Sequence, residues 1–168
     1  KGFLFAGISA GLKASNKKDL ALILAPEGSI FSGMFTQSIV RASCVDICEE
    51  RIKTTSGFVR AILINSGQAN ACTGNLGIQH FQIATGKIAE LLGIKEEEVL
   101  MCSTGVIGVP IQINDLVKNL PNLVSDLKGN NFQNAAEAIL TTDLTLKKVL
   151  IETIIQGRKI KIAGFAKG

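Results

Sequence analysis

A run of apolar residues at helical spacing most constrains the fold of this chain. Five residues recur every three or four positions: Ile78, Phe81, Ala84, Ile88 and Leu92. Residues at this spacing share one face of a helix, so the pattern predicts a helix over residues 76–92 that ends at Gly93. An apolar helix face must pack on another layer, and we expect that layer to be a sheet.

Apolar runs in the first half of the chain predict the strands of this sheet. Each run is rich in Ile, Leu, Phe or Val and is bounded by Gly, Ser, Asn or Pro. The runs cover residues 3–8, 19–24, 30–36 and 59–65. A further short buried strand is predicted over residues 99–102.

The second half predicts two more helices. Asn114 is expected to cap a helix that begins at Asp115. Pro121 is expected to break or kink that helix, because proline removes a backbone donor. A short helix over residues 132–140 follows.

Beyond residue 148 the apolar period becomes two, which is typical of strands. A turn at residues 156–158 separates two such segments, and the second covers residues 159–166, so the pattern predicts a hairpin. Together these elements predict one α/β domain over residues 1–168, a layered sandwich of mixed or antiparallel sheets flanked by helices.

Charge and composition exclude several function classes. The 168 residues include 18 Lys and Arg against 14 Asp and Glu, and the net charge of +4 forms no basic run. Trp and Tyr are absent, so nucleic-acid binding is not expected. No apolar stretch approaches the roughly 18 residues that cross a bilayer. We therefore expect an intracellular, cytoplasmic protein that binds neither nucleic acid nor membrane.

The cysteines and the single histidine predict no metal site. Cys44, Cys48, Cys72 and Cys102 form no CxxC pair, so neither zinc nor disulfides are expected. Cys72 and Cys102 lie in apolar or small-residue segments and are expected to be buried free thiols. His80 is expected to be a surface or structural residue, so any catalysis uses another group.

Two glycine-containing segments are candidate functional loops. Residues 65–74 predict a structured turn, with a ligand loop as the alternative. Residues 103–108 are expected to leave the strand that ends at Cys102. There Gly105 permits a turn that aims a backbone N–H outward beside the hydroxyl of Thr104. Such a donor pair stabilises a developing oxyanion, and a tight turn without chemistry is the alternative.

Two later segments complete the candidate set. Thr141, Thr142 and Asp143 stand between a helix and the hairpin, where a cap or turn role is the alternative to substrate binding. Lys167 ends a predicted strand, and a lysine there either is solvated or binds a substrate carboxylate. The chain begins with Lys1, and its strand pattern runs to its last residue, so we expect it to be part of a longer protein.

Seven segments, in their order and spacing, resemble the alpha chain of the glutamate N-acetyltransferase family, also called ornithine acetyltransferase. They cover residues 6–8, 19–23, 35–36, 65–74, 103–108, 141–143 and 164–168. The resemblance implies a precursor that cuts itself before a threonine, which becomes the N-terminal nucleophile of a beta chain. It implies that Thr104 and Gly105 form the oxyanion hole, and that Lys167 and either Thr141 or Thr142 bind substrate.

The resemblance also implies the reaction and the assembly. Acetyl passes from N2-acetylornithine to the enzyme threonine and then to glutamate, in arginine biosynthesis. No cofactor is implied, although acetyl-CoA is a possible co-substrate. The fold is expected to be related to the self-processing aminopeptidases with N-terminal nucleophiles, and the assembly to contain two alpha and two beta chains.

The chain departs from the family pattern in three places. Residues 35–38 read Phe-Thr-Gln-Ser and residues 42–45 read Ala-Ser-Cys-Val, where the family has Phe-Thr-Thr-Asn and Ala-Ala-Pro-Val. Leu144 and Leu146 replace a common Thr and Pro. None of these positions is a candidate site residue, so only local loop geometry is affected.

Two other functions compete with this interpretation. A self-cleaving amidohydrolase of the related aminopeptidase type would let water attack the acyl-enzyme. Thr104 and Gly105 together with Lys167 favour the transferase, because they suit an acetylated amino acid and its carboxylate. A non-catalytic subunit that binds a small molecule is the third possibility, and the absence of a partner chain would favour it.

Overall fold

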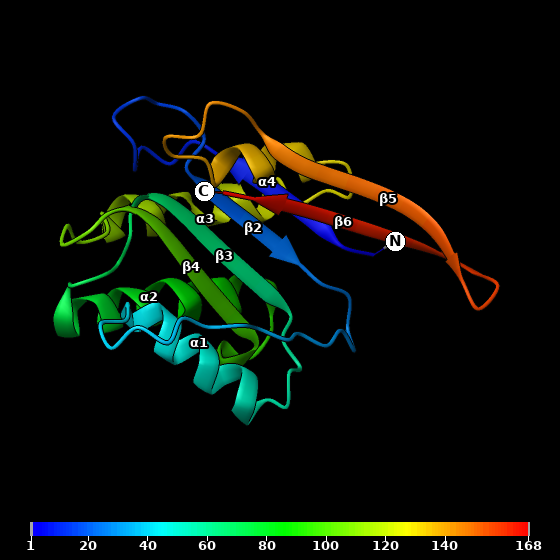
Figure 1. The fold of residues 1–168 in the computed structure, drawn as a ribbon. Coiled ribbons are helices and arrows are strands. Elements are labelled where there is room, and N and C mark those ends of the chain that lie inside the picture. Colours follow the sequence, from blue (N-terminus) through cyan, green and yellow to red (C-terminus); the bar gives the residue numbers. More distant parts are fainter. Residues whose placement is uncertain (1, 168) are drawn as a thin grey trace.

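A computed structural model describes residues 2–167 and contains a four-stranded sheet beside a separate hairpin. The sheet order is β1 (Leu4–Ile8), β2 (Leu20–Leu24), β3 (Ala61–Gln68) and β4 (Val99–Val106). Only β3 and β4 are parallel, and the other neighbours are antiparallel (Figure 1). The hairpin consists of β5 (Lys147–Ile155) and β6 (Arg158–Ala166). The predicted α/β fold with mixed and antiparallel sheets is confirmed.

Helices cover both faces of the sheet. The helices α1 (Ser43–Thr54), α2 (Gly74–Leu92) and α3 (Ile113–Ser125) pack on one face, and α4 (Phe132–Ala138) packs on the other face at β1 and β2. A short 3₁₀ helix (Glu96–Glu98) leads into β4. Parallel strands need a crossover connection, and α2 supplies it between β3 and β4.

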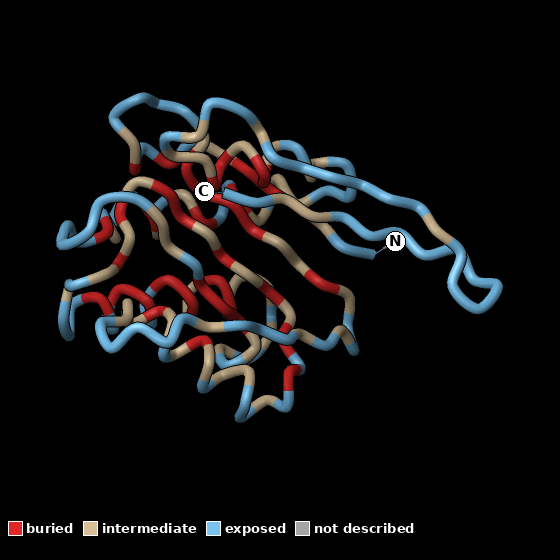
Figure 2. The backbone as a smooth tube through the Cα atoms, viewed as in Figure 1, coloured by how far each residue is buried: buried red, intermediate tan, exposed pale blue. Residues whose placement is uncertain are grey.

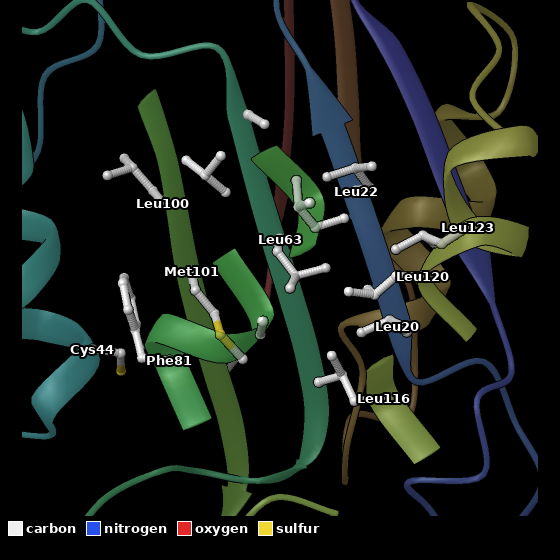
Figure 3. Packing of buried hydrophobic residues seen from close by; sticks show 14 of the residues in the cluster. Leu20, Leu22, Cys44, Leu63, Phe81, Leu100, Met101, Leu116, Leu120 and Leu123 are labelled. Atoms are coloured by element: carbon white, nitrogen blue, oxygen red, sulfur yellow. The ribbon is translucent and has the colours of Figure 1, made fainter. Parts of the chain in front are cut away.

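Alternating residues of the strands fill the core beneath α2 and α3. Leu63 of β3 and Met101 of β4 pack near Phe81 of α2 (Figure 3). Leu20 and Leu22 of β2 pack in the same core with three leucines of α3: Leu116, Leu120 and Leu123. The predicted helix over 76–92 is confirmed, and Gly93 ends it at a φ of 64°, a left-handed conformation that glycine adopts at low cost.

Two elements of the first half differ from the sequence prediction. Residues 30–36 do not form a strand, because only Ile30 forms an isolated bridge, with Phe58. Helix α1 was not predicted. Its fully buried positions are Cys44 and Cys48, so it lacks the stripe of large aliphatic residues that marks α2.

The boundaries of α3 also differ. The helix begins at Ile113 rather than Asp115, and it continues through Pro121 to Ser125 without the expected break. Pro121 lies on the exposed side, while three buried leucines hold the opposite side in the core. Packing of an amphipathic face outweighs the loss of one backbone donor.

All four cysteines are free, but the expected burial of Cys72 and Cys102 is wrong. Cys72 and Cys102 are exposed, whereas Cys44 and Cys48 are buried. By strand alternation, Cys102 lies on the face of β4 opposite to Met101. On that face α4 packs on β1 and β2 rather than on β4, so Cys102 is left exposed. His80 is buried on α2, and burial lowers its pKa, as fits a structural histidine.

The hairpin is exposed along most of its length and extends beyond the other elements (Figure 2). Ile151, Ile155, Ile160 and Ile162 lie on one face of it by register and alternation, and each is at least 37% exposed. Among residues 2–167 no helix is long and apolar enough to cross a bilayer. No group of His, Cys, Asp or Glu within the same range is arranged to hold a metal ion.

Candidate active site at the carboxyl ends of β3 and β4

The parallel strands β3 and β4 end side by side, because Gln68 pairs with Val106. In α/β sheets the edge formed by the carboxyl ends of parallel strands is the usual place for a ligand site. The segments that follow both strands start at this edge. The loop between β1 and β2, the end of α4 and the end of β6 lie on the same side of the molecule.

Backbone contact between Gly67 and Gly105 defines this edge. A Cβ on Gly105 would lie 2.3 Å from the carbonyl carbon of Gly67, and its φ is +136°. Only glycine permits both the conformation and the approach. The strand continues to Val106, so Thr104 and Gly105 lie within β4 and not in a turn after Cys102 as predicted.

Thr104 shares the α4 face of the sheet with Ser66. The two residues pair in the parallel register, and the Ser66 hydroxyl donates to the Ala138 carbonyl over 2.5 Å. This bond ties the end of β3 to the end of α4. Because β4 is an edge strand, alternate backbone N–H groups point away from β3 and have no partner strand in the described sheet.

The segment after α4 brings the candidate threonines to the same edge. Lys13 donates from Nζ to the Leu140 carbonyl over 2.9 Å, directly before Thr141. Thr141 is half-buried, and its amide donates to the Asp143 carboxylate over 3.5 Å. Thr142 is exposed.

The position of Lys167 follows from β6. Phe165 packs against the buried cluster that contains Ala21 and Ala138, so the end of β6 reaches the α4 face of the sheet. Ala166 pairs with Lys147, whose Nζ lies 2.8 Å from the Asp143 carboxylate. These contacts bring exposed Lys167 to the same side of the molecule as the two threonines.

The loop between β1 and β2 buttresses this edge, and sequence reasoning missed its role. The buried Asp19 carboxylate accepts three backbone N–H bonds, from Ala10 at 2.6 Å, Leu12 at 2.7 Å and Lys13 at 3.0 Å. The Leu12 carbonyl in turn accepts the Gln68 amide over 2.8 Å. Burial lowers the pKa of Lys13, and attraction to Asp19 partly offsets this.

The only signal in the sequence was a charged residue at the start of an apolar strand. The sequence pattern places Asp19 in that strand and indicates no role for Lys13. Their partners are backbone groups, which no residue pattern reveals.

Residues 65–68 lie within β3 and not in the predicted turn, so only residues 69–73 form the turn between β3 and α2. The Asn65 amide donates to the Gln68 carbonyl over 3.1 Å, and the Asn70 amide donates to the Gly77 carbonyl over 3.0 Å. A surface hollow of about 260 Å³ adjoins this turn and is lined in part by Arg41, Asp46 and Cys72. None of the five predicted site residues lines it.

Comparisons with known proteins show the family and the fold of this chain. The model of the ArgJ family matches residues 4–168, so the chain belongs to the ArgJ family. Two crystal structures share the fold with a TM-score of 0.93: an arginine biosynthesis bifunctional protein ArgJ from Bacillus halodurans, 32% identical, and an ornithine acetyltransferase complexed with ornithine from Mycobacterium tuberculosis, 34% identical. The Bacillus halodurans structure matches 100% of this chain, which covers 87% of that structure's chain. The Mycobacterium tuberculosis structure matches 99% of this chain, which covers 88% of that structure's chain.

Curated relatives are longer than this chain. An arginine biosynthesis bifunctional protein ArgJ from Prochlorococcus marinus subsp. pastoris is 76% identical over 99% of this chain and 42% of its own length. A protein named ArgJ 1 from Nostoc sp. is 45% identical over 100% of this chain and 40% of its own length. The chain therefore spans about two fifths of the relatives it matches.

Gly105→Ala tests the close approach of β3 and β4. The new methyl group would overlap the Gly67 backbone, and the left-handed conformation disfavours alanine, so we expect a loss of about 2 kcal/mol or more in unfolding free energy. Gly108→Ala is the matched control, because Gly108 also has a positive φ of 79° but faces open space. Equal urea midpoints for the two variants would contradict the assigned contact.

Proposed function

We propose that this chain is the alpha part of an enzyme that transfers acetyl from N2-acetylornithine to glutamate. Family membership is the observation that carries the proposal, and the attachment of the end of α4 to the end of β3 through Ser66 supports it. The ornithine complexed with the Mycobacterium tuberculosis enzyme fits the amino-acid product of the first half-reaction. A place in arginine biosynthesis follows, with the cytoplasm as the compartment.

The nucleophile of the proposed reaction is the N-terminal threonine of a beta chain cut from the same precursor. Its hydroxyl attacks the acetyl carbonyl, and its own amine takes the proton, so no histidine is required. The tetrahedral intermediate collapses to acetyl-threonine as ornithine leaves with that proton. The amine of glutamate then attacks the acetyl-threonine and regenerates the hydroxyl.

Thr104 and Gly105 stabilise the oxyanion of both half-reactions in this proposal. A hydroxyl and a backbone N–H beside it are the donors that a tetrahedral oxyanion needs. The position of both residues in an edge strand supports this role, because an edge leaves backbone donors free for a ligand.

Lys167 and the threonine pair bind the amino-acid part of the substrates. Both N2-acetylornithine and glutamate carry an α-carboxylate, which a lysine binds as a point charge. Half-buried Thr141 fits a positioning hydroxyl nearest the sheet, and exposed Thr142 is the alternative. No cofactor is assigned, and acetyl-CoA as a second acetyl donor fits the word bifunctional in the names of the relatives.

The beta chain also supplies the missing cover for the hairpin. Isolated two-stranded hairpins are marginally stable in water, and the apolar face of β5 and β6 is exposed here. We assign this face to contact with the beta chain, in an assembly of two alpha and two beta chains. The relatives are long enough to contain such a second part.

Thr104→Ala tests the oxyanion role. Loss of one donor should slow acetyl transfer about a hundredfold, or about 3 kcal/mol, and should slow self-cleavage as well. Thr104→Ser keeps the hydroxyl and is expected to recover most of the activity. Turnover of the alanine variant within twofold of wild type would return Thr104 to a purely structural role.

Lys167→Met tests carboxylate binding. The apolar stem remains while the charge is lost, so KM for both N2-acetylornithine and glutamate should rise about tenfold, consistent with a charge-assisted bond of about 1.5 to 3 kcal/mol. Lys118→Met, on the exposed surface of α3, is the matched control and should leave both values unchanged. Steady-state kinetics decide between a bound and a solvated Lys167, since a solvated lysine gives the same KM values in both variants.

A further inference from the structure

We infer that Asp19 and Lys13 are positioning residues that hold the two halves of the candidate site in register. The inference rests on the proposed function, in which Thr104 and Gly105 stabilise the oxyanion and Thr141 or Thr142 binds substrate. Neither Asp19 nor Lys13 is assigned to substrate contact. Their role is to fix the backbone on which the site residues stand.

Asp19 fixes the loop first. Its carboxylate is fully buried, and its two oxygens accept backbone N–H bonds from Ala10, Leu12 and Lys13. A carboxylate that accepts several N–H groups satisfies donors that would otherwise be buried without partners. The amide of Asp19 donates to the Ile8 carbonyl, so the residue is held from both sides.

The loop then contacts β3, which in turn contacts β4 at Gly105. A Cβ on Gly67 would lie 2.7 Å from the Leu12 carbonyl oxygen, and a Cβ on Gly105 would lie 2.3 Å from the Gly67 carbonyl carbon. Leu12, Gly67 and Gly105 are thus stacked backbone on backbone, with no side chain between them to absorb a displacement. A shift of the loop is therefore transmitted to Gly105.

Lys13 connects the same loop to the substrate segment. Its amide is held by Asp19, while its ammonium group donates to the Leu140 carbonyl over 2.9 Å. Leu140 directly precedes Thr141. One loop consequently contacts the end of β3 through Leu12, and it contacts the residue before Thr141 through Lys13.

The experiment uses the full-length protein with Asp19→Asn, Lys13→Met and the double variant. Asparagine has the shape of aspartate but one acceptor oxygen in place of two. Its NH₂ group would therefore face backbone N–H donors that the Asp19 carboxylate now satisfies. Asp19→Asn should lower kcat about tenfold and raise KM for glutamate about fivefold, because both connections loosen. Lys13→Met should raise KM about fivefold with kcat within twofold of wild type, and Lys13→Arg, which keeps the donor, should restore KM.

The double variant separates positioning from general destabilisation. Because Lys13 acts through the loop that Asp19 holds, KM of the double variant should equal that of Asp19→Asn alone, whereas independent effects would multiply. Glu96→Gln is the structural control. It removes an ion pair with Arg51 near the start of β4, at the other end of the sheet, and should lower thermal stability without changing kcat or KM.

Hydrogen exchange tests the inference apart from activity. Asp19→Asn should speed exchange of the amides of residues 10–13, 67–68 and 140–142, and Glu96→Gln should not. Unchanged exchange at residues 67–68 and 140–142, or multiplicative KM effects, would overturn the inference. If the wild-type protein transfers no acetyl group, the proposed function fails and the exchange result alone decides the positioning role.

Discussion

The parallel pairing of β3 with β4 is the constraint on which the rest of the site depends. It places two carboxyl ends at one edge and requires α2 as a crossover. At that edge the backbones of Gly67 and Gly105 approach too closely for any side chain. The loop held by Asp19 and the end of α4 both attach to the end of β3, through the Gln68 amide and the Ser66 hydroxyl. The edge is therefore assembled from backbone contacts between distant parts of the chain.

A second constraint acts on the outer surface. The hairpin presents branched apolar residues to solvent, with Ile151 and Ile162 each 50% exposed. The ion pair between Lys161 and Glu152 crosses it, but an exposed pair contributes little stability. Such a hairpin requires cover, and the proposed second chain explains both this surface and the greater length of the relatives.

The sequence predicted those elements whose apolar period is long and regular. Helix α2 and the β5–β6 hairpin were predicted closely, because each of their segments keeps one apolar period along its length. Helix α1 was missed because cysteines occupy its fully buried positions. Residues 30–36 were predicted as a strand because they are apolar, yet a strand also needs a neighbour.

The candidate site was predicted only in part. Residue types made Thr104, Gly105, Thr141, Thr142 and Lys167 candidates, and the family resemblance implied their roles, which stay predictions. The supporting contacts of Asp19, Lys13 and Ser66 were not predictable, because each bonds a backbone group that is remote in sequence or hidden in a loop. The apolar pattern of a sequence predicts which face of a helix or strand is buried. These contacts depend on how separate elements pack against one another.

Intact mass of the full-length protein, before and after incubation with N2-acetylornithine, tests the central claim most directly. We predict two polypeptides, of which the second begins at a threonine and gains the mass of one acetyl group, while this chain gains none. An active protein that remains a single uncut polypeptide would contradict the account. So would an acetyl group carried on this chain.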